Sequence, residues 1–255
     1  LALRKQPQDA GFARLAAFRN AHPDWPASAL QKRVEDILFR TRNVSPDAAK
    51  WFSTNAPQTA LGKLAMARVL TQNGQTIVAA ELVRSVWRDA ELSAPLEKSL
   101  LNEFGHALGK AEHKARADYA LYRERDAIAL RAATLAGPDV LALARARIAV
   151  VNEAASDKLI AAVSPELQKD AGLLFARIHK ARKAKKFDEA AQLMLSAPRD
   201  PAVLVDPDEW WVERRLIARK LLDLGDSATA YRIASEHSAL GAEQRIEAEF
   251  HAGWI

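Results

Sequence analysis

A short pattern of small and apolar residues occurs twice in this chain with identical spacing. Each copy has an alanine–arginine pair, a leucine, a glycine and a later alanine, and the copies run from Ala67 through Gly74 to Ala79 and from Ala218 through Gly225 to Ala230. The glycine is expected to end a helix in the left-handed conformation, where a Cβ is penalised, and the later alanine lets the next helix pack closely. A third, looser copy runs from Ala176 to Ala191, through a charged turn that is two residues longer and lacks glycine. The pattern predicts antiparallel helical hairpins.

Hairpins that cannot each bury their apolar face alone are expected to stack. Alanine and leucine dominate, aromatic residues make up only 7 %, and strand-forming runs are scarce, which favours many closely packed helices. We predict an all-α fold, a right-handed α-superhelix (α/α solenoid) of irregular antiparallel hairpins with about 13–16 helices. We expect a single domain over residues 1–255. The copies are too degenerate for a consensus tetratricopeptide array.

Turn-forming residues divide the helical segments from one another. The predicted helices span residues 9–21, 27–42, 46–54, 58–73, 76–89, 94–104, 110–124, 127–136, 138–151, 154–163, 168–184, 187–197, 207–224, 227–236 and 242–255. Between residues 199 and 206, four apolar residues stand between two prolines, so we expect this connection to pack against the helices.

The segment from residue 206 to residue 255 predicts three consecutive helices. Asp206 can cap the first helix, with Pro207 at its first position and Glu209 where a capping box places its carboxylate. The third helix carries a stripe of Ile246, Phe250 and Trp254. Because no capping residue follows, we expect the chain to be a piece of a longer protein.

The same segment carries the residues of a family resemblance. They are Trp210, Trp211, Glu213, Arg214, Arg215, Ala218, Arg219, Leu221, Leu222, Ala230, Tyr231, Ala234, His237, Ala248, Glu249, Phe250, Ala252, Gly253 and Trp254. In these residues the chain resembles the N-terminal superhelical region of the soluble lytic murein transglycosylases, periplasmic enzymes that cut the glycan strands of peptidoglycan. The match is clear from Lys169 onward and loose before it. The resemblance implies a U- or ring-shaped superhelix, a periplasmic location and a lysozyme-like catalytic domain on the C-terminal side, which this chain lacks.

The resemblance assigns no catalytic residue to this chain. In the family, a catalytic glutamate is followed by serine, with a Gly-rich, Met-Gln-containing segment downstream. The chain contains no Glu-Ser pair and no such segment. We therefore expect the parent enzyme to cleave peptidoglycan, with a 1,6-anhydromuramyl product, and this chain alone to be inactive.

Charge and composition point to a polyanionic partner. The net charge is +5, which suits peptidoglycan, an anionic membrane or nucleic acid, and also an ordinary soluble domain. The chain has no cysteine and no apolar run of about 18 residues that could span a bilayer. Its first residues lack the order of a signal peptide, so any leader of an exported parent is expected to precede Leu1.

A run of basic residues is the candidate binding patch. It consists of Arg177, Lys180, Arg182, Lys183, Lys185 and Lys186. These cations could simply form a solvated face at a helix C-terminus, where they are favourably placed. Alternatively, they could face the carboxylates of the glycan–peptide polymer. Nucleic acid is disfavoured because the run has no aromatic residues for base stacking and no recognition-helix motif.

Six residues of the family motif are expected to be structural, namely Trp210, Trp211, Arg214, Arg219, Tyr231 and Trp254. The adjacent tryptophans either pack between helices or bind sugar. Arg214 shares the stripe of Trp210 and, if buried, needs a carboxylate or several carbonyl partners. We predict no metal or cofactor site. The acidic cluster of Asp200, Asp206, Asp208 and Glu209 suits helix capping, and the six histidines show no metal-binding spacing.

The sequence therefore favours a non-catalytic superhelical scaffold that binds and positions peptidoglycan strands, with the missing catalytic domain as its partner in the same chain. The alternative is a helical-repeat adaptor that binds a protein. A basic nucleic-acid module is the third hypothesis.

Overall fold

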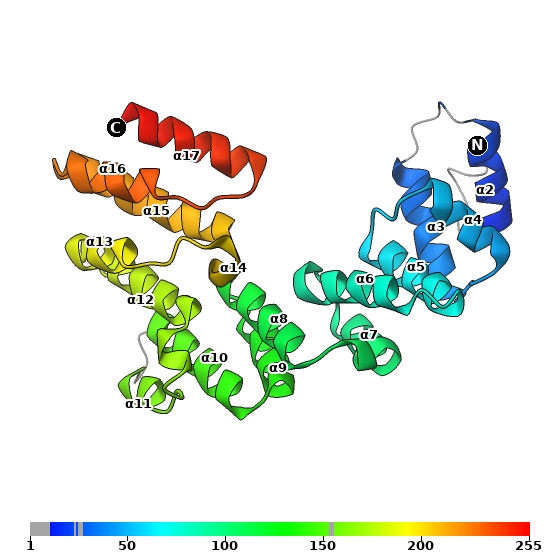
Figure 1. Ribbon diagram of the computed structural model, residues 1–255, viewed down its shortest axis with the longest axis horizontal. Coiled ribbons are helices and arrows are strands. Elements are labelled where there is room, and N and C mark those ends of the chain that lie inside the picture. The colour runs from blue at the N-terminus through cyan, green and yellow to red at the C-terminus, as the bar shows by residue number, and fades with distance from the viewer. Residues whose placement is uncertain (1–10, 23, 25–27, 153–155) are drawn as a thin grey trace. The chain divides into compact units, whose positions relative to one another are not determined.

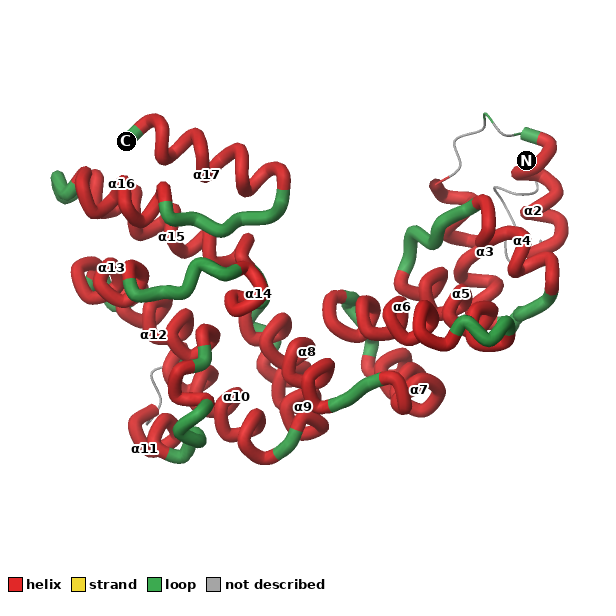
Figure 2. Tube along the Cα trace, viewed as in Figure 1, coloured by secondary structure: helices red, strands yellow, loops and turns green. Residues whose placement is uncertain are grey.

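The computed structural model describes residues 11–22, 24, 28–152 and 156–255 (Figure 1). All regular structure within these residues is helical, and none of it is strand, which confirms the predicted all-α fold (Figure 2). The chain falls into two compact units, one that ends at Leu108 and one that covers Gly109–Ile255. The handedness of the superhelix and the single domain stay predictions.

The first unit contains α2 (Phe12–Ala21), α3 (Ser28–Arg40), α4 (Pro46–Thr54), α5 (Ala60–Gln72), α6 (Thr76–Asp89), α7 (Ala94–Phe104) and the 3-10 turn η1 (Gly105–Ala107). One apolar cluster joins α2 to α5 around Leu38 and Trp51, and another joins α5 to α7 around Trp87. The buried carboxylate of Glu35 accepts hydrogen bonds from the backbone N–H groups of Gln58 and Thr59, each at 2.8 Å. These bonds fix the loop before α5.

The second unit contains α8 (Lys110–Tyr122), α9 (Asp126–Ala136), α10 (Pro138–Val151), α11 (Ser156–Ala161), the 3-10 turn η2 (Leu167–Lys169), α12 (Ala171–Lys183), α13 (Phe187–Leu195), α14 (Pro201–Leu204), α15 (Pro207–Asp223), α16 (Ser227–Ser235) and α17 (Ala242–Trp254). Successive long helices pack side by side in chain order, from α8 on α9 to α16 on α17. The connection expected to pack forms the short helix α14, in which Leu204 is fully buried.

Four helical hairpins have the same type of turn. A residue with positive φ stands between the two helices, and these residues are Gly74 (77°), Glu124 (54°), Lys185 (61°) and Gly225 (87°). In each turn, the next N–H donates back to a carbonyl in the last helical turn, over 2.8–2.9 Å; the pairs are Gln75 with Leu70, Arg125 with Ala120, Lys186 with Ala181 and Asp226 with Leu221. This is the bond that satisfies an otherwise orphaned carbonyl at a helix end.

The second helix of each hairpin places a buried alanine at the same offset from the turn. These alanines are Ala79, Ala129, Ala190 and Ala230, none more than 3 % exposed. A small side chain at this position lets the two helices approach, as the sequence pattern predicts.

The third hairpin differs from its sequence prediction. Its turn is no longer than the others, because α12 ends at Lys183 and α13 begins at Phe187, with Lys185 in the place of glycine. The residue that corresponds to Ala67 and Ala218 in the first helix of this hairpin is Ile178, not Ala176. The two helices of the fourth hairpin were predicted, but not that their turn, with Glu124 at positive φ, belongs to the same pattern. Residues other than glycine can adopt the left-handed conformation at a cost of about 1–2 kcal/mol, so a search for glycine misses such turns.

Gly225 and Gly253 offer a matched test of this turn. Neither glycine has a neighbour near the place of an added Cβ, so backbone conformation alone decides the effect of alanine. Gly225→Ala is expected to lower the free energy of unfolding by about 1 kcal/mol, because alanine is strained at positive φ. Gly253→Ala, inside α17, is expected to raise it by about 0.5 kcal/mol. Urea denaturation measures both, and effects of the same sign would contradict the assignment.

Candidate functional site

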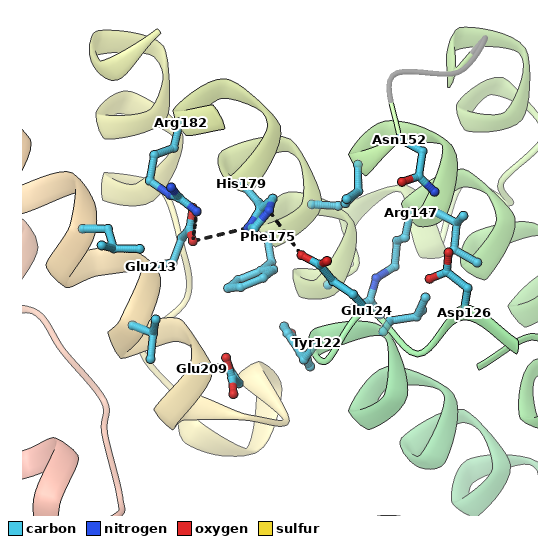
Figure 3. Close-up of a pocket in the computed structure, with 17 residues that line it drawn as sticks. Tyr122, Glu124, Asp126, Arg147, Asn152, Phe175, His179, Arg182, Glu209 and Glu213 are labelled. Atoms are coloured by element: carbon cyan, nitrogen blue, oxygen red, sulfur yellow. Dashed lines mark hydrogen bonds and ion pairs between the residues drawn. The ribbon is translucent and has the colours of Figure 1, made fainter. Parts of the chain in front are cut away.

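A cleft of about 330 Å³ opens in the second unit. Its walls come from the end of α8 and the start of α9, from the second half of α10, and from α12 and α15 (Figure 3). It combines apolar side chains with Tyr122, His179, two arginines and four carboxyl groups. Because charged, aromatic and apolar side chains meet in one concave surface, this cleft is the candidate functional site.

Glu213 is the most strongly held carboxylate of the cleft. Arg182 binds both of its oxygens, with Nε 2.5 Å from Oε1 and an Nη atom 3.1 Å from Oε2. His179 Nδ1 lies 3.4 Å from Oε2 (Figure 3). Burial acts to raise the pKa of Glu213, but the contacts with His179 and Arg182 outweigh it, so this pKa lies below its ordinary value. Glu213 is therefore an ionised structural anchor between α12 and α15.

Arg147 is fixed behind the cleft by a second ionic network. Its guanidinium pairs with Asp118, which also binds Lys114 at 2.7 Å. Lys114 reaches Asp170 at 2.9 Å. A Cβ on Gly172 would collide with the guanidinium of Arg147, so glycine is needed for this close approach. The network ties α8 to α10 and to the start of α12.

The floor of the cleft is aromatic. The Tyr122 hydroxyl donates to the Leu204 carbonyl at 2.9 Å and accepts from Trp210 Nε1 at 3.0 Å. Phe175 packs edge-on against both rings, with centroid distances of 4.9 Å to Tyr122 and 5.1 Å to Trp210. Burial raises the pKa of Tyr122 far above its ordinary value. Tyr122 is thus a neutral, fully bonded support.

The start of α15 directs a carboxyl group into the cleft. Asp206 caps this helix by accepting from the Glu209 N–H at 3.3 Å, with Pro207 at the first position, as predicted. The return bond of a capping box does not form, because the Asp206 N–H donates to the Leu204 carbonyl at 2.8 Å. Burial, and then the neighbouring Asp206, raise the pKa of Glu209. The Glu209 carboxyl therefore lines the cleft instead of capping its helix.

The structure divides the predicted basic patch. Arg182 lines the cleft and forms an ion pair with Glu213, whereas Arg177 and Lys180 are half-buried. Lys183, Lys185 and Lys186 are exposed around the turn between α12 and α13. Their ionic contacts are loose, with Lys183 3.7 Å from Glu124 and Lys186 3.5 Å from Glu189.

The residues of the family motif occupy different environments. Trp210 and Trp211 are buried, and Trp211 Nε1 donates to Glu247 of α17 at 2.9 Å. Arg214 is 1 % exposed, yet within the described residues its guanidinium donates a single hydrogen bond, to the Ile233 carbonyl at 3.2 Å. Tyr231 is half exposed, and Arg219 and Trp254 are exposed.

The stripe on α17 faces outward. Ile246, Phe250 and Trp254 are 72 %, 65 % and 66 % exposed, whereas Ala248 and His251 form the packed side. The helix is held to α15 by hydrogen bonds from Trp211 and Arg215 to Glu247. The apolar stripe is thus the outer face of the helix.

Sequence reasoning did not assemble the cleft. Tyr122, Asp126, Arg147 and His179 come from four helices and show no shared spacing in the chain. The sequence singled out two residues of the cleft, Arg182 in the basic run and Glu209 in the acidic cluster, but interpreted them as part of a binding patch and of a helix cap.

No family model, curated protein or solved structure matches this chain. Across the described ranges, no group of His, Asp and Glu side chains could hold a metal ion. None of the helices described there is long and apolar enough to cross a membrane.

Arg182→Gln is expected to destabilise the protein by about 3 kcal/mol at neutral pH, because it leaves a buried carboxylate poorly paired. The pKa of Glu213 is lowered in the folded state, so its contribution is present above the unfolded pKa and is lost as pH falls through the folded value. The difference from wild type should therefore shrink in acid. Urea denaturation across pH measures it.

The neighbouring Lys183→Gln is the control for Arg182→Gln. Lys183 is 53 % exposed, so its replacement should change the free energy of unfolding by no more than about 0.5 kcal/mol. Equal effects of the two variants would contradict the structural role of Arg182.

The stability of Arg214 variants is expected to depend on the volume of the replacing side chain. Burial lowers its pKa to about 10, since no carboxylate forms an ion pair with it in the described part of the chain. Arg214→Met keeps much of the volume and removes an under-paired charge, so stability should change by less than about 1 kcal/mol. Arg214→Ala leaves a cavity and should cost about 2–5 kcal/mol. Thermal unfolding of both variants tests this, and equal losses would instead show that the charge itself is needed.

Proposed function

We propose that this chain is the non-catalytic helical scaffold of a periplasmic lytic murein transglycosylase, in which it binds and positions peptidoglycan strands. The observation that carries the proposal is the resemblance of residues 206–255 to the superhelical region of these enzymes. Seven of the nineteen matching residues are buried in the joint core of α15, α16 and α17, among them Trp210, Trp211, Ala218, Ala230 and Ala248. The resemblance thus describes a packing module rather than a reaction centre.

The exposed lysines at the turn between α12 and α13 suit the proposed polymer. Lys183, Lys185 and Lys186 stand close together and have only loose ionic partners. The stem peptides and muramyl groups of peptidoglycan carry carboxylates, which such a cluster attracts. The patch is smaller than the sequence predicted, because Arg182 forms an ion pair with Glu213 and does not face the polymer.

Glu209 and Glu213, the two neighbouring carboxyl groups on α15, do not form the carboxyl pair of an ordinary glycosidase. Glu209, with its raised pKa, has the character of an acid, but both oxygens of Glu213 are bound by Arg182. A nucleophile or base needs an oxygen that can reach the substrate or a water molecule. We assign the cutting of the glycan to the catalytic domain of the proposed parent enzyme.

The second candidate is a protein-binding adaptor. It is favoured by the outward apolar stripe of Ile246, Phe250 and Trp254 on α17, since exposed apolar patches often mark interaction surfaces. An adaptor would bind a protein in solution and would not bind purified sacculi.

Pull-down with purified sacculi tests the proposal. The chain should sediment with sacculi, and added salt should release it, because the attraction is electrostatic. Replacing Lys183, Lys185 and Lys186 by glutamine should weaken binding by about tenfold, if each lysine contributes a few tenths of a kcal/mol or more.

A charge-matched variant is the control for the sacculus experiment. Lys32, Lys98 and Lys110 are also exposed, and their replacement by glutamine removes the same charge at scattered positions. This variant should retain most of the binding. Equal losses would show a general charge effect, and absence of sedimentation by the wild type would refute the scaffold function.

A further inference from the structure

Most polar groups in the cleft already have partners. Arg147 is paired with Asp118, and Arg182 with Glu213. The Tyr122 hydroxyl both donates and accepts a hydrogen bond. No cation or hydroxyl of this lining is therefore left over to receive an anion.

Carboxyl groups outnumber the cationic groups that line the cleft. Among the described residues, the side chains of Asp126 and Glu209 form no hydrogen bond or ion pair. Glu124, at the mouth, makes only the loose contacts of 3.7 Å with His179 and Lys183. With Glu213 included, the lining has four carboxyl groups against two guanidinium groups, both already paired. The potential in the cleft is negative, which favours a cationic ligand.

His179 lies between two of these carboxylates. Its Nδ1 atom is 3.4 Å from Glu213, and its Nε2 atom, which is buried, is 3.7 Å from Glu124 (Figure 3). Glu213 and Glu124 therefore face the histidine, and Asp126 and Glu209 are the carboxyl groups of the lining that are left for a ligand.

Apart from the amide of Asn152, the other side chains of the cleft are apolar. Phe175, Ile148, Val151, Val212 and Leu216 supply most of the remaining surface. In Figure 3, Glu209 and Asp126 lie on either side of Tyr122, so acidic groups flank an aromatic floor. A cavity of about 330 Å³ is at the lower end of the range for small-molecule sites. It suits an aliphatic chain better than a sugar ring, which would need many free hydrogen-bonding groups.

We propose that this cleft binds an aliphatic chain that carries an ammonium group. The ammonium would donate hydrogen bonds to Glu209, and the second ammonium of a diamine would donate to Asp126, while the chain lies against Phe175 and the apolar walls. Burial and then the neighbouring Asp206 raise the pKa of Glu209, and the positive charge of an ammonium beside it would act in the opposite direction. The inference does not depend on peptidoglycan binding.

Calorimetry on the whole chain tests the proposal with three probes. Cadaverine represents a free diamine, N-acetyl-lysine methylamide represents a lysine side chain in a peptide, and N-acetyl-norleucine methylamide is the neutral control. At least one amine should bind, and the norleucine compound should not. Tighter binding of the lysine compound assigns the site to a peptide side chain, and tighter binding of cadaverine assigns it to a free amine.

Two variants locate the site. Glu209→Gln should weaken binding of the preferred amine by about tenfold, because it removes a charged acceptor. Asp223→Asn, on the same helix but 69 % exposed and outside the cleft, should leave binding unchanged. Circular dichroism checks that both variants are folded. If Glu209→Gln is not, Asp126→Asn takes its place.

Three results would overturn the inference. They are the absence of amine binding at millimolar concentrations, equal binding of the norleucine compound, and equal effects of the cleft variant and Asp223→Asn. None of them bears on the sacculus experiment, which depends on the lysines outside the cleft. The two proposals can therefore fail separately.

Discussion

The close approach of paired helices is the constraint on which the second unit depends. It needs a left-handed residue between the helices, so that a backbone N–H can return to the last helical turn, and a small side chain soon afterwards. Glu124, Lys185 and Gly225 meet the first need, and Ala129, Ala190 and Ala230 meet the second. With the turns fixed in this way, the first helices of successive hairpins lie near enough for their long side chains to bond between hairpins.

Those bonds are mostly ionic, and they create the cleft. Arg182 and Glu213 join α12 to α15, while Arg147 and Asp118 join α10 to α8. Both pairs are well buried. A buried pair adds little net stability, but the loss of either partner is costly because it leaves a buried charge unpaired. The pairs therefore act as fixed spacers. Between them remains a space with an aromatic floor and with two carboxyl groups, Asp126 and Glu209, that have no ion-pair partner among the described residues.

The sequence predicted the fold class, because helical periodicity, turn residues and alanine at the helix contacts are local signals. It also predicted the cap at Asp206 and Pro207. It predicted the two helices around Glu124 but missed their shared turn type, and it gave the turn at Lys185 the wrong length, because a charged residue is no sequence signal for positive φ. The cleft could not be predicted from the sequence for another reason. Tyr122, Arg147 and His179 come together only through the stacking of hairpins, and the basic run contained Arg182, whose partner Glu213 lies on another helix.

Val205 carries a consequence for local motion. This β-branched residue has φ 65° and ψ −46°, in a tight turn closed by the bond from the Asp206 N–H to the Leu204 carbonyl. Such a conformation stores about 1–3 kcal/mol and persists only while its surroundings hold it, here the Tyr122 hydroxyl bound to the same carbonyl. Release of that strain lowers the free energy of opening α14 relative to opening the hairpins. Amide hydrogens of this short segment should therefore exchange with solvent earlier than those of α12 or α15, and its opening would release the Tyr122 hydroxyl in the floor of the cleft.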